Sequence, residues 1–444
     1  MPRVPALALL ALTCAVASAE PAREPSAAEF ANAPLPGQES GRIDPVGDGD
    51  STAREIGRAA LLVPRWTFEL VLTPARTGLW LYDRYELDQR AGDATAAGTM
   101  RLGFSPSLSF ESGYGITGGT AGGRLDAHNL FGAHEEASLE AAAGAGYYFR
   151  QLYAVTATSG HRFGDRFTLA LDTGYEVRAR DAFYGLGNGA GEVTRYSQHR
   201  ARAGLTGDLA VWSDLHVRPS VALAQQSFGD PAEGASAEDL YMPVGWMGTQ
   251  SAYGELALRW DSRRGGGEWD PHWKLTNGTL ATAYAGRYHQ LDAGGDFWRY
   301  GLDAEQLVRL GMGPRVLAAQ FHGEAVTGST DEVPFTELPS LGGPLYLRGY
   351  APDRFRDRVA LVGALEYRWD LARWLGAHVF VDAGRVYDSI DSIGVDHLRA
   401  GYGGGIMVGH ATTLLDIASS IDGGFVIALT LDPIHDLEAR ARRR

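Results

Sequence analysis

Long stretches of the chain alternate hydrophobic and polar residues, the period of a β-strand with one apolar face. In 167–178 most odd positions are hydrophobic, while Asp172, Glu176 and Arg178 occupy even positions. The same alternation recurs in many segments of about ten residues or more, a length that can cross a bilayer when the strand is tilted. The strands of a soluble β-sandwich, the alternative, are usually shorter and bury their apolar face in a core. The pattern therefore predicts an all-β, antiparallel transmembrane β-barrel.

Counting these segments gives about sixteen strands, an even number as expected for a bacterial barrel. The expected strands are 99–110, 113–127, 134–146, 148–161, 165–178, 194–211, 215–227, 250–261, 273–287, 294–310, 315–327, 358–370, 376–388, 399–409, 411–421 and 423–431. Short turns at Gly164-Asp165 and Ser213-Asp214 should alternate with long loops at 180–192, 229–250 and 329–357. Short periplasmic turns opposite long external loops produce this alternation in outer-membrane barrels. The barrel domain is expected to span 98–433.

The first residues have the pattern of a secretory signal. Arg3 precedes the apolar run Ala6–Val16, and the small residues Ala17-Ser18-Ala19 stand before Glu20. A charged start, an apolar run too short to span a membrane and a small-residue cleavage site predict a signal peptide over 1–19. No later stretch approaches the roughly 20 consecutive apolar residues of a membrane helix, so a mature membrane protein would have to span as a closed barrel.

Between the signal and the first strand, two segments differ in character. Residues 20–52 are rich in Pro, Ala, Gly and acidic residues and lack an apolar period, which predicts a disordered periplasmic leader. Residues 53–97 contain proline-broken amphipathic stretches with Trp66, Trp80 and neighbouring arginines. Such stretches predict short helices that lie at the membrane interface or cap the barrel, and the sequence leaves both possibilities open.

Composition narrows the class of protein. The formal net charge of −14 disfavours nucleic-acid binding, which relies on basic patches. The 58 glycines and 10% aromatic residues suit a sheet with many tight turns. The one cysteine, Cys14, lies in the expected signal peptide, so the mature chain would have no disulfide. A large closed sheet can supply stability without one.

Two segments point to a family. The loop segment 341–350 has the sequence LGGPLYLRGY, and the strand segment 380–384 has the sequence FVDAG. The first resembles the Arg-Gly-aromatic loop motif, and the second the Phe-x-Asp-x-Gly strand motif, of the BamA/TamA superfamily, also called the bacterial surface antigen family, which includes two-partner secretion transporters. Weaker matches lie at 183–188, 260–263 and 365–368, with Pro271 and Gly278. The resemblance covers most of 98–431.

The alternation also places the side chains of these motifs. Asp382 shares the strand face opposite Val379 and Val381, and Glu366 opposes the apolar face of its own strand, so both carboxylates should point into the lumen. The resemblance implies that the 329–357 loop enters the barrel and that an arginine pins it to the inner wall. A guanidinium can bridge two carboxylates, which the ammonium of a lysine cannot match. The expected latch comprises Arg348, Gly349, Tyr350, Glu366, Asp382 and Gly384.

Two departures from the family pattern stand out. Residues 20–97 lack the βααββ pattern of a POTRA domain, so we expect a branch of the family without POTRA domains. The chain continues after its last expected strand with Asp432-Pro433 and a basic tail over 434–444 instead of ending on an aromatic residue.

The sequence also lacks the usual catalytic and ligand-binding motifs. It has no Gly-x-x-x-x-Gly-Lys, His-Glu-x-x-His or Gly-x-Ser-x-Gly segment and no set of cysteine ligands. We therefore expect neither an enzyme nor a cofactor or metal. The resemblance implies a Gram-negative outer-membrane protein that assists insertion or translocation of proteins or lipids. Its expected partners are outer-membrane lipids and unfolded outer-membrane or secreted proteins, with no nucleic acid; the alternative is a passive pore or structural barrel.

Overall fold

The computed structural model describes most of the expected barrel domain. The described residues are 101–113, 116–146, 150–189, 192–231, 234–265, 275–291, 295–311, 315–372, 375–408 and 413–431. All of them belong to one compact unit. The predicted signal peptide at 1–19, the leader at 20–52, the helical segment at 53–97 and the basic tail at 434–444 lie outside the described residues.

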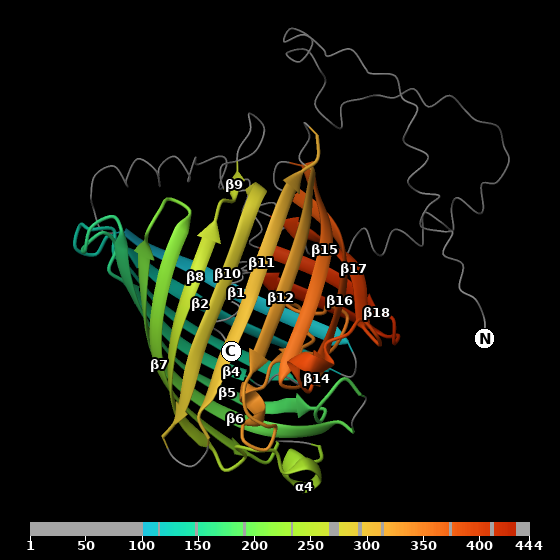
Figure 1. Cartoon of the computed structure of the whole chain (residues 1–444). Helices are drawn as coiled ribbons and strands as arrows, with labels where there is room; N and C mark the ends of the chain where they lie inside the picture. Colours follow the sequence, from blue (N-terminus) through green and yellow to red (C-terminus); the bar gives the residue numbers. More distant parts are fainter. Residues whose placement is uncertain are drawn as a thin grey trace, which may run out of the picture. The chain divides into compact units, whose positions relative to one another are not determined.

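The main sheet closes on itself as an antiparallel barrel (Figure 1). Over the described residues it contains 17 strands, of which the two-residue β9 (Arg264–Gly265) is a short addition and the other 16 form the ring. Each ring strand pairs with its neighbours along the chain, and β1 pairs with β19 to close the circle. The ring strands are β1 (Arg101–Gly113), β2 (Ile116–His128), β3 (Glu136–Gly146), β4 (Arg150–Thr158), β5 (Phe167–Phe183), β6 (Thr194–Ala210), β7 (Leu215–Gly229), β8 (Thr249–Asp261), β10 (Leu275–Gln290), β11 (Phe297–Arg309), β12 (Arg315–Val326), β15 (Val359–Ala372), β16 (Leu375–Tyr387), β17 (Arg399–Val408), β18 (Thr413–Ser420) and β19 (Phe425–Leu431). The predicted fold class is confirmed.

The inner and outer faces follow the alternation of the sequence. Along β16 the outward Val379 and Val381 are 48% and 47% exposed, whereas Asp382 between β15 and β17 is 2% exposed. Leu256 and Leu258 on β8 are likewise half exposed on the outside. Apolar side chains that face outward and charged side chains that face the lumen are the arrangement of a membrane barrel.

One strand is longer than the sequence pattern indicates. The predicted strand 165–178 continues to Phe183, so the first four residues of the predicted 180–192 loop belong to β5 instead. The pairing register with β6 shifts between Arg178 and Asp181. A shift of this kind breaks the strict alternation, and the pattern therefore stops at the irregularity although the strand does not.

Loop lengths alternate less regularly than expected. The connections 129–135 and 159–166 lie at the same barrel end as the tight turn 211–214, and Gly164-Asp165 is only part of the second of them. The connection 327–358 lies at the other end, which we call the loop end. It contains the turn η1 (Phe335–Glu337) and a small hairpin of β13 (Ser340–Leu341) and β14 (Phe355–Arg356).

Two further short elements lie in connections at the loop end. The helix α4 (Ala237–Tyr241) follows β7, and the turn η2 (Ile390–Ser392) follows β16. Neither was predicted from the sequence, because a single helical turn is too short to show a hydrophobic period. Among the described residues, no helix is long or apolar enough to cross a membrane.

Candidate functional site: the loop inside the barrel

The 327–358 connection folds back against the inner wall of the barrel. Its residues Leu341, Leu347 and Phe355 are at most 2% exposed. They form one hydrophobic cluster with Tyr346 and Tyr350 of the connection and with the wall residues Ala360, Val362 and Val386. Because these wall residues belong to β15 and β16, burial of apolar surface holds the connection against those strands.

Arg348 lies at the centre of this contact and binds two carboxylates. Its Nε and one Nη donate hydrogen bonds to Asp382 at 2.9 and 2.8 Å, and its other Nη donates to Glu366 at 2.8 Å. The backbone N–H of Arg348 also donates to Asp382, at 2.8 Å. All three side chains are nearly buried, with 12%, 8% and 2% exposed for Arg348, Glu366 and Asp382. The structure thus brings together the three charged residues singled out from the sequence, through charge-assisted hydrogen bonds.

The glycines of the motifs allow close backbone contact. Gly349 has φ +91°, and a Cβ there would lie 2.3 Å from the carbonyl oxygen of Ser419. On β17, a Cβ at Gly401 would lie 1.6 Å from the carbonyl oxygen of Arg348. A Cβ at Gly384 would lie 2.7 Å from the carbonyl oxygen of Leu361. The backbone of the connection therefore rests directly on the wall, with no room for a side chain between them.

Tyr350 binds the same segment to a turn at the loop end of the barrel. Its hydroxyl donates to Asp422 at 2.8 Å, and its ring packs edge-on against Phe355. Burial, with the hydrogen bond to Asp422, raises the pKa of Tyr350 to about 12, so the hydroxyl stays protonated and keeps donating at neutral pH. Asp422 belongs to the turn between β18 and β19, and no motif of the sequence indicates that it is part of the site.

Two more contacts were not anticipated. Tyr346 stacks on His322 of β12 with 4.0 Å between ring centroids, and His322 pairs with Asp303 of β11 at 2.6 Å. Further along, Gln226 of β7 donates to Glu337 at 2.6 Å. His322, Asp303 and Gln226 occupy inward positions of their strands, which the alternation indicates. Nothing in the sequence shows that the connection reaches them.

An aromatic cluster holds the earlier part of the connection. Phe335 is 2% exposed and packs against the rings of Phe183, Tyr196 and Phe228, with centroid separations of 5.2, 5.2 and 5.1 Å. These three residues belong to β5, β6 and β7. The connection therefore contacts walls on two sides of the barrel, since the Arg348 contacts lie on β15 and β16.

Ion pairs continue from Glu366 around the inner wall. Arg368 lies between two carboxylates, 2.6 Å from Glu366 and 3.6 Å from Glu305. Glu305 in turn pairs with Arg263 at 2.9 Å, and Arg263 pairs with Asp261 at 2.9 Å. The result is an unbroken row of alternating charges from Asp382 on β16 to Asp261 on β8. We call it the ion-pair row. Within the described part of the chain, no group of three or more His, Cys, Asp or Glu residues is arranged to hold a metal ion.

Comparison with known proteins identifies the family. Residues 276–421, which include nearly all of β10, the strands β11 to β18 and the three residues Arg348, Glu366 and Asp382, match the model of the Omp85 superfamily domain. This part of the barrel is similar to the Omp85 superfamily domain. This confirms the resemblance to the BamA/TamA superfamily inferred from the two motifs. The match supports a location in the outer membrane of a Gram-negative bacterium. A search of curated protein sequences finds no match.

Solved structures of similar fold include BamA and CdiB barrels. BamA from Haemophilus ducreyi lacking POTRA domains 1–3 matches with a TM-score of 0.52 and 15% identity, over 74% of this chain and 71% of that chain. CdiB from Acinetobacter baumannii matches at 0.51 and 12% identity, over 74% and 60% of the two chains. CdiB from Escherichia coli matches at 0.50 and 11% identity, over 73% and 62%. The present chain thus spans less than two thirds of either CdiB, and these likenesses concern the fold.

Proposed function

We propose that this Omp85 barrel assists the insertion of proteins into the outer membrane or their translocation across it. The observation that carries the proposal is the docked connection, in which Arg348 bridges Asp382 and Glu366 inside the lumen. An element held by a few polar contacts at its centre can be fixed or released as a unit, which suits a barrel that rearranges while it handles a substrate. Unfolded outer-membrane or secreted proteins, together with the surrounding lipids, would be its partners.

The closing seam of the barrel supports the same proposal. The seam joins the first and last strands of the ring, β1 and β19, which pair from Gly113 with Val426 to Leu108 with Leu431. Two strands that separate at such a seam can each pair with a strand from another chain. The seam is thus a suitable place for a substrate strand to pair.

A passive pore, the second candidate, is less well supported. Such a pore conducts through an open lumen, whereas here part of the lumen holds the connection with its buried Phe335, Leu341 and Phe355. The two candidates also differ in what they require of the seam, because a pore functions with its wall permanently closed.

A crosslinking experiment tests the proposal. Ser112 lies opposite Ile427 across the seam and opposite Thr117 across the β1–β2 pair. In a chain carrying Cys14→Ala, the pair Ser112→Cys with Ile427→Cys should lock the seam when oxidised. The pair Ser112→Cys with Thr117→Cys is the matched control, because it joins strands that stay paired. Each protein is reconstituted in liposomes, and the rate at which a urea-unfolded outer-membrane protein inserts is measured.

We expect the unlocked protein to accelerate insertion, the seam disulfide to abolish the acceleration, and the control disulfide to leave it intact. Reduction should restore the activity of the seam variant. If neither insertion nor translocation of an unfolded protein is accelerated while the liposomes conduct ions, the pore is the correct assignment.

A further inference from the structure

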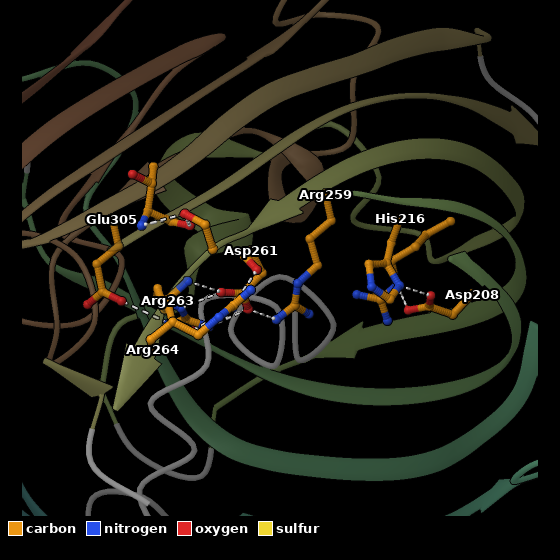
Figure 2. Close-up of polar contacts among 10 residues, drawn as sticks. Asp208, His216, Arg259, Asp261, Arg263, Arg264 and Glu305 are labelled. Atoms are coloured by element: carbon orange, nitrogen blue, oxygen red, sulfur yellow. Dashed lines mark hydrogen bonds and ion pairs between the residues drawn. The ribbon is translucent and has the colours of Figure 1, made fainter. Parts of the chain in front are cut away.

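A cavity of about 410 Å³ lies in the wall at the barrel end opposite the loop end (Figure 2). Its lining residues come from β6, β7, β8, β9, β10 and the turn between β8 and β9, and are Asp208, His216, Arg259, Asp261, Arg263, Arg264 and Leu275. On β8, Leu256 and Leu258 face outward, so Arg259 and Asp261 at the alternate positions face the lumen. The cavity is therefore reached from the lumen and its mouth, and not from the lipid.

Positive charge exceeds negative charge around this cavity. Three arginines and one histidine line it, against two carboxylates. Each of these carboxylates already contacts two basic groups. Asp261 pairs with Arg259 and Arg263 at 2.8 and 2.9 Å, and Asp208 pairs with His216 at 2.5 Å and with Arg218 at 3.1 Å. Each carboxylate therefore neutralises only part of the charge of each basic group, and an added anion could bind the guanidinium groups as well.

The three arginines differ in exposure. The side chains of Arg263 and Arg259 are 9% and 16% exposed and are held in place by Asp261. Arg264 is 63% exposed; it pairs with Asp214, which lies outside the cavity lining, and donates to the backbone oxygens of Arg263 and Asp261 at 2.9 and 3.4 Å. An exposed ion pair of this kind contributes little, so Arg264 can turn to an incoming anion at low cost. The cavity thus combines two fixed guanidinium groups with one that can close on a ligand.

We propose that this cavity binds carboxylate side chains of an acidic polypeptide segment that enters the barrel from the end opposite the loop. The inference rests on the proposed function, because the acidic segment would belong to the protein that is inserted or translocated. The cavity would be the first place at which that protein contacts the barrel wall. Carboxylates are favoured over lipid phosphates because Arg259 and Asp261 of the lining face the lumen. The bidentate geometry of guanidinium with carboxylate supplies the recognition.

The ion-pair row connects this cavity with the docked connection. One Nη of Arg263 donates to Glu305 at 2.9 Å, and Glu305 also contacts Arg368, which pairs with Glu366 beside Arg348. A carboxylate that binds Arg263 competes with Glu305 for the same guanidinium. Glu305 then turns towards Arg368, which is shared with Glu366. Binding in the cavity therefore changes the charges that hold Arg348.

Protection of a thiol in the cavity measures binding directly. The full chain with Cys14→Ala and Leu275→Cys is folded in detergent, and its reaction with a maleimide is timed with and without hexaglutamate peptide. We expect hexaglutamate to slow the reaction at least about fivefold. Arg264→Gln should weaken the apparent affinity for hexaglutamate roughly tenfold, the loss of about one charge-assisted hydrogen bond. High salt should weaken it as well.

Arg287→Gln is the matched control, because Arg287 is also an exposed arginine, 55% exposed, that pairs with an aspartate, Asp296, near the loop end. It should leave the affinity unchanged. Calorimetric titration of the Cys14→Ala chain with hexaglutamate repeats the measurement without the reporter thiol. Absence of binding in both assays, or equal losses for Arg264→Gln and Arg287→Gln, would overturn the proposal.

Protection by a short-chain phosphatidylglycerol but not by hexaglutamate would make the cavity a lipid site and overturn the assignment to a polypeptide. Neither assay involves insertion of a substrate protein. A negative result here therefore leaves the proposed insertion activity standing, and a failed insertion assay leaves the binding result interpretable.

Discussion

The guanidinium carbon of Arg348 lies 3.5 Å from the centre of the Phe380 ring. The same guanidinium binds Asp382, two residues further along the same face of β16. The Phe-x-Asp segment thus provides an aromatic face and a carboxylate that a planar cation can use together. Lysine would keep the charge at this position but would lose both the stacking and the paired hydrogen bonds.

Loss of the arginine should free the connection while the barrel stays closed. We expect Arg348→Ala to destabilise the docked state by about 1–3 kcal/mol, because it leaves Asp382 without a guanidinium partner and Glu366 with Arg368 alone, in a partly wet lumen. Limited proteolysis of the folded protein should then cut within 327–358. Arg348→Lys should give an intermediate rate of cleavage.

The pairing itself can be tested with a double-mutant cycle. Asp382→Ala should expose the connection much as Arg348→Ala does, and the double variant should be scarcely worse than either single variant. Strictly additive effects would show that the two residues act independently, contrary to the contacts in the structure.

Close backbone packing gives a second way to release the connection without touching a charge. Gly401→Ala places a Cβ where the carbonyl oxygen of Arg348 lies, so we expect the connection to become as protease-sensitive as in Arg348→Ala. Gly363→Ala is the control, since the nearest atom to its Cβ would be 3.9 Å away. Equal cleavage of both variants would indicate a general loss of barrel stability instead.

Interruption of the ion-pair row should weaken the effect that binding in the cavity has on the docked connection. Arg368→Gln removes the cation between Glu305 and Glu366. In the wild type, hexaglutamate should raise the rate of cleavage within 327–358, and in Arg368→Gln this response should be lost although hexaglutamate still binds. A response of unchanged size in Arg368→Gln would show that the row does not transmit the effect.

The carboxyl of Glu135 should titrate at an unusually low pH. Glu135 lies in a connection outside the strands. Burial alone would raise the pKa of this group, but hydrogen bonds from Arg162 and from the backbone N–H groups of Ala133 and Phe131 lower it to about 2, from an ordinary value of 4.5. Because the pKa is lower in the folded chain, the carboxylate stabilises the fold above about pH 4.5, and this contribution is lost as the pH falls to about 2.

Hydrogen exchange in 129–135 should therefore stay slow down to about pH 3 and rise only below it, after correction for the intrinsic pH dependence. Glu135→Gln should show faster exchange with no such transition. A carbon chemical shift of the Glu135 carboxyl that titrates near pH 4.5 would contradict the expectation.

The sequence predicted the strands and the inward faces because alternation is a local property of a strand. It placed Asp382 and Glu366 in the lumen for that reason, and the loop motif supplied Arg348. It could not predict that Arg263 meets Glu305 or that Tyr346 meets His322. Alternation shows which face of the barrel a residue occupies, but not its height along the axis, which depends on the stagger between strands. The irregularity after Arg178 in β5 could not be predicted for a related reason, because it interrupts the alternation from which strands are predicted.

The contacts of the docked connection also impose an order on folding. Arg348 and Tyr350 bind Asp382 and Asp422, which follow them by 34 and 72 residues in the chain. Asp382 and Asp422 are in place only when β16 and the β18–β19 turn have formed. The connection therefore cannot dock until most of the barrel strands have paired. Contacts so distant along the chain form slowly because the intervening segment has to be ordered first. Docking of the connection is therefore expected to be completed only after β18 has formed.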